Sequence, residues 1–120
     1  MKLLIHGGFF SEFSQSNETK LAKQAAMERI AKNSYEFLKT HAALETVVFA
    51  VEQLENDPLF NAGIGSQIQS DGVIRMSASL MDGNTKKFSG VVNVQQVKNP
   101  IRIAENLMGV DDPSRFTITA

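Results

Sequence analysis

Residues 54–66 read LENDPLFNAGIGS, a segment without the regular apolar spacing of a helix or a strand. Pro58 and two glycines interrupt it, so the sequence predicts an irregular loop that is rich in turns. The loop nevertheless carries Leu59, Phe60 and Ile64, three apolar side chains that water solvates poorly. We therefore expect the loop to pack against the rest of the protein.

The polar residues of this loop leave two interpretations open. Glu55 and Asp57 are either solvated turn carboxylates or part of a loop whose backbone carbonyl oxygens converge on a hard cation. Asn61 is either a local turn former or a side-chain amide directed at a substrate. The spacing of these residues does not choose between the interpretations.

Two helices are predicted before the loop. Residues 20–39 place apolar side chains at helical spacing among lysines and glutamates, and residues 44–54 follow the i, i+3, i+4, i+7 pattern. The valines and the threonine of the second helix are poor helix formers, so packing must hold it. Because the helices follow one another directly, we expect an antiparallel pair.

The chain begins with a predicted strand at residues 2–6, which Gly7 and Gly8 end. Backbone N–H groups that are exposed in such a glycine turn can hold an anion or an oxyanion. A simple tight turn is the competing interpretation. His6 by itself is more often a core or capping histidine than a catalyst.

Strands and turns are predicted after the loop. Asp71-Gly72 is a strong hairpin signal between residues 67–70 and 73–81, because its tight turn needs positive φ. A second turn at residues 81–84 leads to a third strand at 88–97. These residues therefore predict a three-stranded meander.

A short helix and one more strand complete the predicted α+β order. Asn99-Pro100 predicts a helix N-terminus, with the asparagine as cap and proline in the first turn, and Gly109 ends the helix. Residues 116–120 predict the beginning of another strand. No repeat or linker divides the chain, so we treat it as one unit.

Composition excludes several classes of protein. The 120 residues are 42% hydrophobic and 21% charged, an ordinary globular balance. Twelve Lys and Arg against thirteen Asp and Glu give a net charge of -1, which attracts neither nucleic acid nor a membrane surface. The absence of cysteine excludes thiolate chemistry and fits a cytoplasmic location. The first apolar run is too short for a signal peptide or a membrane span.

Several motifs follow one another in a specific order. They are IHGG at residues 5–8, PLFNAGIGS at 58–66, DG at 71–72, ASLMDG at 78–83 and VKNPI at 97–101. In this order the chain resembles the plant-type L-asparaginase and isoaspartyl peptidase family. The resemblance implies an N-terminal nucleophile hydrolase with a four-layer αββα sandwich. Residues 1–120 would be the α-subunit part of that single domain, and a second (β) chain would complete it.

The family resemblance also implies an activity, the hydrolysis of L-asparagine or of β-aspartyl peptides. One precursor cuts itself into α and β chains, and the new N-terminal threonine of the β chain supplies a hydroxyl nucleophile and an α-amine base. No threonine here follows Gly or Asp, so the chain lacks the nucleophile and resembles the α chain alone. The implied partners are the β chain, in an (αβ)2 heterotetramer, and a small amide or dipeptide substrate.

The resemblance assigns roles to individual residues. Asn61 matches an asparagine that orients the nucleophilic threonine, and His6, Gly7 and Gly8 match a turn close to the cleavage site and the active site. The 54–66 loop matches a loop that binds a structural sodium ion, and no organic cofactor is implied. The sodium ligands would be the backbone carbonyls of Leu54, Glu55, Asp57, Phe60, Ala62 and Ile64.

Three residues depart from the family pattern, and two alternatives follow. Phe9 and Phe10 stand where small residues are usual, and Ser77 stands where aspartate is common. A glycosylasparaginase-like enzyme shares the fold and the threonine but fits the LFNAG segment less well. A non-catalytic scaffold remnant of the same fold is favoured by the two phenylalanines.

Overall fold

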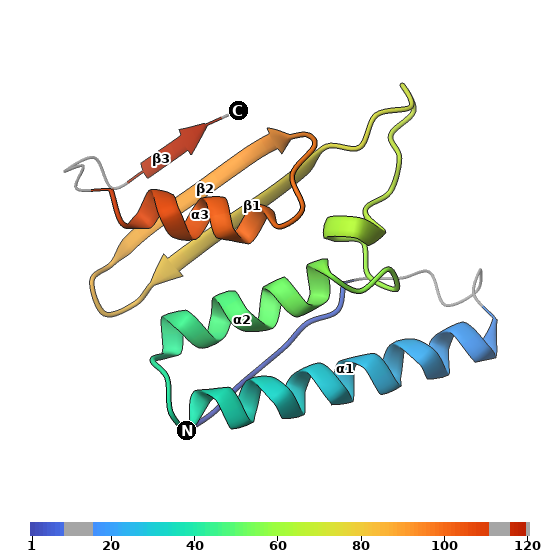
Figure 1. Cartoon of the computed structure of the whole chain (residues 1–120), viewed down its shortest axis with the longest axis horizontal. Helices are drawn as coiled ribbons and strands as arrows, with labels where there is room; N and C mark the ends of the chain where they lie inside the picture. Colours follow the sequence, from blue (N-terminus) through green and yellow to red (C-terminus); the bar gives the residue numbers. More distant parts are fainter. Residues whose placement is uncertain (9–15, 111–115, 120) are drawn as a thin grey trace.

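The computed structural model describes residues 1–8, 16–110 and 116–119. In chain order the elements are α1 (Asn17–Leu38), α2 (Ala43–Glu55), the 3-10 turn η2 (Gly63–Gly65), β1 (Met76–Asp82), β2 (Lys87–Val94), α3 (Pro100–Met108) and β3 (Phe116–Thr119) (Figure 1). This mixed α/β body measures 48 × 41 × 20 Å. Its smallest dimension corresponds to one layer of helices on one layer of strands.

The helices α1 and α2 confirm the predicted antiparallel pair (Figure 1). The Ser16 hydroxyl accepts the Thr19 backbone N–H at 3.2 Å and starts α1 slightly earlier than predicted. Between the helices, the Gln53 amide donates to the buried Ser34 hydroxyl at 3.2 Å and accepts from the Asn33 amide at 3.2 Å. These bonds satisfy the buried hydroxyl and fix how the two helices face each other.

The helices α2 and α3 cover one face of the sheet. β1 and β2 form an antiparallel hairpin, and β3 lies parallel to β2, so that α3 is the crossover between them. One core cluster joins these three elements. It consists of Val48 from α2, Leu80 from β1, and Ile101 and Ala104 from α3. On the opposite face of the hairpin Ser77, Ser79 and Met81 are exposed, so no described element covers it.

The 54–66 loop packs against the helices, as its apolar residues predict. Phe60 is 3% exposed and forms a second cluster with Ala26 and Ile30 of α1. Leu59 packs at the edge of this cluster, whereas Ile64 is 57% exposed. The loop is thus anchored by two of its three large apolar side chains.

The prediction of a buried strand at residues 2–6 is wrong. The segment is extended in Figure 1, but no described strand pairs with it. Ile5 packs on the Phe60 cluster, whereas Leu4 is 95% exposed. One side of the segment is therefore partly buried, while the backbone groups have no partner strand among the described residues.

The predicted meander is reduced to a hairpin, because residues 67–70 form no strand. The Gln69 N–H donates to the Val73 carbonyl at 3.0 Å and closes a turn in which Gly72 has φ of 81°. The pairing does not continue from this turn, since residues 67–70 alternate polar side chains around a single isoleucine and offer little apolar surface to bury. β1 consequently begins at Met76.

A bulge interrupts the ladder of β1 and β2 just before its last pair, Met76 with Val94. The register shifts between Met76 and Ala78, and Asn93 on the partner strand takes a positive φ of 57°. The Asn93 N–H donates to the Ser77 hydroxyl at 3.4 Å. Ser77, which departs from the family pattern, therefore still makes a contact at the bulge, and β2 stops at Val94 rather than at the predicted residue 97.

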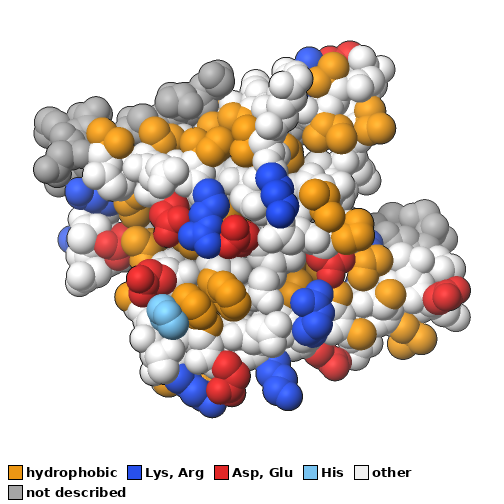
Figure 2. Space-filling model, in the orientation of Figure 1, with side chains coloured by type: hydrophobic (Ala, Val, Ile, Leu, Met, Phe, Trp, Pro, Cys, Tyr) orange, Lys and Arg blue, Asp and Glu red, His pale blue; other side chains and the backbone are white. Residues whose placement is uncertain are grey.

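The remaining predicted elements are confirmed: the turn between β1 and β2, the helix α3 with proline first and Gly109 as its C-cap, and the strand β3. Figure 2 shows Lys and Arg interspersed with Asp and Glu over one face of the molecule, without a patch of one sign. Arg102 of α3 pairs with Glu52 of α2 and with Glu105 of α3. Within the described ranges, no helix is long and apolar enough to span a membrane.

Candidate active site

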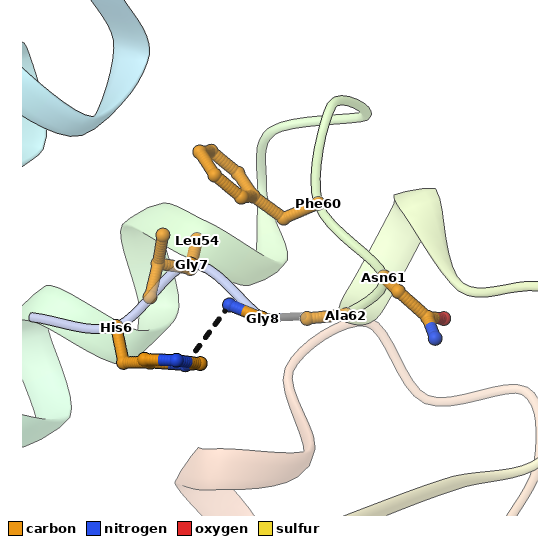
Figure 3. Close-up of a pocket in the computed structure, with 7 residues that line it drawn as sticks. All are labelled: His6, Gly7, Gly8, Leu54, Phe60, Asn61 and Ala62. Atoms are coloured by element: carbon orange, nitrogen blue, oxygen red, sulfur yellow. Dashed lines mark hydrogen bonds between the residues drawn. The ribbon is translucent and has the colours of Figure 1, made fainter. Parts of the chain in front are cut away.

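The glycine turn at residues 6–8 meets the 54–66 loop at a pocket of about 210 Å³ (Figure 3). The lining residues are His6, Gly7, Gly8, Leu54, Phe60, Asn61 and Ala62. Two segments far apart in the sequence, both singled out as candidate sites, thus lie side by side. Phe9 and Phe10, which follow the turn, lie outside the described residues.

Gly7 lets the N-terminal segment approach the helices closely. A Cβ atom at this position would lie 2.9 Å from the Met27 sulfur and 3.1 Å from the Phe60 ring. A larger residue would have to displace the Met27 and Phe60 side chains or move the segment away from them. Gly7 is therefore a packing requirement of the pocket wall.

The turn itself is closed by His6. Its Nδ1 atom accepts the Gly8 backbone N–H at 3.1 Å, and Gly8 has φ of 93° (Figure 3). Because Nδ1 accepts this bond, the proton of the neutral ring lies on Nε2. The bond also occupies the Gly8 N–H, so that group is not available as the anion donor that one interpretation of the turn required.

Asn61 has the first of the two roles that were left open for it, that of a local turn former, and its role toward a substrate stays a prediction. Its Oδ1 accepts the Gln67 backbone N–H at 2.9 Å, which fixes the loop and the amide together. The side chain is exposed and points away from His6 and Gly8 (Figure 3). The Nδ2 group has no partner within the described part of the chain, so it is the hydrogen-bond donor that Asn61 offers to a further group.

Two glycines allow the loop to fold back on its own backbone. Gly63 has φ of 51°, and a Cβ atom there would lie 2.1 Å from the Glu55 carbonyl oxygen. A Cβ atom at Gly65 would lie 2.1 Å from the Phe60 carbonyl oxygen. These positions exclude every side chain and bring the carbonyl oxygens of Glu55 and Phe60 close to η2.

The carbonyl groups predicted as sodium ligands are neutral oxygen donors, which suit a hard cation. Four of them also accept a backbone hydrogen bond of 2.8 to 3.3 Å within the loop, namely Leu54, Asp57, Phe60 and Ala62. Each carbonyl oxygen has two lone pairs, so such a bond leaves one for another partner. No cluster of three His, Cys, Asp or Glu residues that could hold a metal occurs in the described part of the chain. The loop therefore fits a cation held by backbone oxygens.

The carboxylates of the loop are not solvated, so that interpretation of them is wrong. Asp57 accepts the Leu59 backbone N–H at 3.0 Å and pairs with Arg29 of α1 at 2.9 Å. This pair ties the loop to α1, and the Asp57 side chain is only 14% exposed. The side chain therefore has a structural role in addition to the carbonyl role predicted for this residue.

Glu55 has a side-chain role that the sequence did not reveal. It is 3% exposed, and its Oε1 accepts the Ile101 backbone N–H at 3.0 Å while Oε2 accepts from the Asn99 amide at 3.1 Å. The last residue of α2 thus caps the first turn of α3, a task that the sequence assigned to the Asn99 side chain. Burial raises the pKa of the Glu55 carboxyl, and the bonds from Asn99 and Ile101 oppose that rise.

Comparison with known proteins gives consistent matches. A family model described as asparaginase matches residues 1–116. The chain is 47% identical over 112 residues to the isoaspartyl peptidase/L-asparaginase of Synechocystis sp., covering 92% of this chain and 33% of that protein. It is 36% identical over 110 residues to the plant-type L-asparaginase of Pyrobaculum calidifontis, covering 92% of this chain and 36% of that protein.

A third relative, the isoaspartyl peptidase of Salmonella typhimurium, is 37% identical over 109 residues, which cover 88% of this chain and 35% of that protein. The chain therefore spans about a third of the length of the curated relatives it matches. The match includes both segments that build the pocket. On this match over nearly all of its residues, the chain belongs to the asparaginase family.

Proposed function

We propose that this chain is the α-subunit part of an amidohydrolase that acts on L-asparagine, on β-aspartyl peptides, or on both. The observation that carries the proposal is the pocket in which the glycine turn at residues 6–8 meets the loop of Asn61. The relatives support it, because one is named isoaspartyl peptidase/L-asparaginase, another plant-type L-asparaginase and the third isoaspartyl peptidase. The chain contributes to the site but does not hold the nucleophile.

The nucleophile would be the N-terminal threonine of a β chain cut from the same precursor. Its hydroxyl oxygen attacks the side-chain carbonyl of the substrate, and its α-amine accepts the hydroxyl proton. The C–N bond then breaks, the leaving ammonia or peptide amine receives that proton, and a β-aspartyl ester remains. Water hydrolyses the ester, which frees aspartate and restores the threonine.

Within this mechanism Asn61 orients the nucleophile. The bond from the Gln67 N–H holds its Oδ1, so the amide cannot rotate freely and its Nδ2 is directed outward. We assign this Nδ2 as a hydrogen-bond donor to the threonine hydroxyl. The turn of His6, Gly7 and Gly8 forms the adjoining wall, close to the position of self-cleavage.

The fold would be completed by the β chain into a four-layer αββα sandwich of the N-terminal nucleophile hydrolase type. Residues 1–120 are then one part of a single domain, assembled as an (αβ)2 heterotetramer in the cytoplasm. Two observations support a missing layer. One face of the hairpin is exposed, and the extended segment at residues 2–6 has one exposed side at Leu4 and no described partner strand.

We also propose a structural sodium ion in the 54–66 loop, and no organic cofactor. The carbonyls of Leu54, Glu55, Asp57, Phe60, Ala62 and Ile64 would hold it, and the ion would cross-link the two ends of the loop. The close approach of backbone at Gly63 and Gly65 supports this assignment. The ion has no part in the chemical step.

The test is to purify the native protein, sequence the N-terminus of every chain present, and measure aspartate release from L-asparagine and from a β-aspartyl dipeptide. We expect a second chain that begins with threonine, together with release of aspartate. A single chain that releases no aspartate from either substrate would reject the proposal in favour of a non-catalytic scaffold.

A further inference from the structure

Met27 of α1 lies behind the wall of the pocket, against Gly7. A Cβ atom at Gly7 would lie 2.9 Å from the Met27 sulfur and 3.5 Å from the Met27 Cγ atom, so this thioether packs on the backbone of the glycine turn. The same Cβ atom would lie 3.1 Å from the Phe60 ring. The thioether and the ring are thus both neighbours of Gly7, and Gly7 and Phe60 line the pocket (Figure 3).

This contact is the edge of the core cluster that anchors the 54–66 loop. Met27 and Ile5 pack there against Ala26, Ile30 and Phe60. Thioethers make favourable contacts with aromatic rings and fill irregular gaps between side chains. Because the extended segment at residues 2–6 has no partner strand among the described residues, apolar packing of this kind holds the turn in place.

The Met27 side chain is only partly buried, so a small oxidant can reach its sulfur. The chain has no cysteine, which leaves its methionines as the sulfur groups open to oxidation. With hydrogen peroxide, a lone pair of the sulfur attacks one peroxide oxygen and the O–O bond breaks. The sulfur gives up two electrons and becomes a sulfoxide, while the other oxygen takes up the proton and leaves as water.

The sulfoxide does not fit where the thioether packs. It is a polar group, and its oxygen costs free energy when it is buried against Gly7 and the Phe60 ring without a hydrogen-bond donor. Rotation of the flexible Met27 side chain toward solvent avoids this cost but leaves a void beside Gly7. Either result removes packing that holds the turn against the loop.

We propose that Met27 is an oxidation site through which peroxide lowers the activity of the pocket. Conversion of its thioether to the sulfoxide displaces the turn of His6, Gly7 and Gly8 from the loop of Asn61. The inference rests on the proposed function in taking this pocket as the active site. It adds a regulation of that site by an oxidant, and the modification is reversible because reductases return the sulfoxide to methionine.

The other four methionines lie elsewhere. Met1 and Met81 are 74% and 64% exposed, and Met76 begins β1. Met108 of α3 packs on the other core cluster, the one that joins α2, α3 and the sheet, and like Met27 it is partly buried. Met108 is therefore the matched control.

The experiment treats the native protein with hydrogen peroxide and follows oxygen uptake at each methionine by peptide mass spectrometry. Met27→Leu and Met108→Leu remove one sulfur each at nearly constant volume. Once Met27 is oxidised, we expect kcat for aspartate release to fall at least about 10-fold in the wild type and in Met108→Leu, because the site is misplaced. Met27→Leu should keep most of its kcat after the same treatment.

Thermal unfolding gives a readout that does not depend on activity. Peroxide should lower the unfolding midpoint of the wild type and of Met108→Leu by about 3 °C or more, since a core contact is lost. The midpoint of Met27→Leu should fall by less. A Met27 that peroxide leaves unmodified would overturn the proposal, and so would equal losses of kcat in Met27→Leu and the wild type.

The two proposals fail separately. If the untreated protein releases no aspartate, but peroxide lowers its midpoint and Met27→Leu prevents this fall, the proposed function is rejected and Met27 is supported as the oxidation site that loosens the turn. If aspartate release is unchanged when Met27 is fully oxidised, the function is supported and the regulation is rejected.

Discussion

The Glu55 carboxylate accepts the backbone N–H of Ile101 at 3.0 Å, so that the last residue of α2 closes the first turn of α3. The same carboxylate accepts from Asn99 at 3.1 Å and is almost fully buried. The 54–66 loop begins at this point. One side chain therefore connects the loop of the candidate site with the helix that covers the sheet.

Replacing Glu55 should destabilise the protein strongly. Glu55→Ala leaves a buried backbone N–H without a partner, and we expect the free energy of unfolding to fall by about 2–4 kcal/mol. Glu55→Gln keeps one acceptor for Ile101 and should lose less. Chemical denaturation measures both, with the exposed Glu28→Ala as control; equal stability of Glu55→Ala and this control would contradict the capping role.

The donor role of Asn61 can be separated from its role in the loop. Asn61→Asp keeps the Oδ1 that Gln67 requires and removes the Nδ2 donor. If that donor orients the nucleophile, kcat should fall by about 100-fold while KM changes little. Asn84→Asp, in the turn between β1 and β2, is the control. Wild-type kcat in Asn61→Asp would refute the assignment.

The His6 ring should matter through its Nδ1 acceptor rather than through proton transfer. His6→Ala frees the Gly8 N–H and loosens the turn, so we expect a fall in kcat of about 10- to 100-fold from misplacement of the site. His6→Asn offers an acceptor with a similar reach and should restore most of the rate. Steady-state kinetics measure kcat of both variants, with His41→Ala as control. A kcat of His6→Asn as low as that of His6→Ala would argue against the acceptor role.

The turn after β1 should lose stability in acid. The Asp82 carboxylate accepts from the Thr85 hydroxyl at 2.6 Å and from the Asn84 N–H at 3.0 Å, and these bonds lower its pKa. A pKa that is lower in the folded state gives stabilisation at neutral pH, which is lost as the pH falls through that pKa. Acid therefore removes this stabilisation from the wild type but not from Asp82→Asn. Between pH 6 and pH 3, which lie on either side of the usual aspartate pKa of about 3.9, the unfolding midpoint of Asp82→Asn should fall less than that of the wild type.

Sodium should stabilise the folded protein. In sodium chloride we expect an unfolding midpoint about 5 °C above that in tetramethylammonium chloride at equal ionic strength, because an ion that binds only the folded state stabilises it. Gly63→Ala forces a Cβ atom against the Glu55 carbonyl and should abolish the difference. Identical midpoints in the two salts for the wild type would remove the sodium assignment.

Features that depend on near neighbours could be predicted from the sequence. The apolar spacing of residues 44–54 identified α2, and Asn99-Pro100 identified the start of α3. The apolar residues of the loop predicted its packing, and Phe60 indeed forms part of a core. Each of these signals depends on a pattern within a few residues.

Features that depend on distant partners could not be predicted in this way. Residues 2–6 carry a strand pattern, but a strand forms only where another strand supplies hydrogen bonds, and none among the described residues does. The role of Glu55 depends on residues 44 and 46 positions further along the chain, which no local pattern connects. The bond between Ser77 and Asn93 likewise depends on a bulge whose register only the folded hairpin defines.

The part-buried hydrogen bond between Glu55 and Asn99 has an evolutionary consequence. The buried Glu55 carboxylate can only accept hydrogen bonds, so a residue at position 99 that also only accepts would leave two acceptors facing each other. Substitution at either position is then selected against unless the other changes with it. As copies of this gene diverge, we expect positions 55 and 99 to change in pairs.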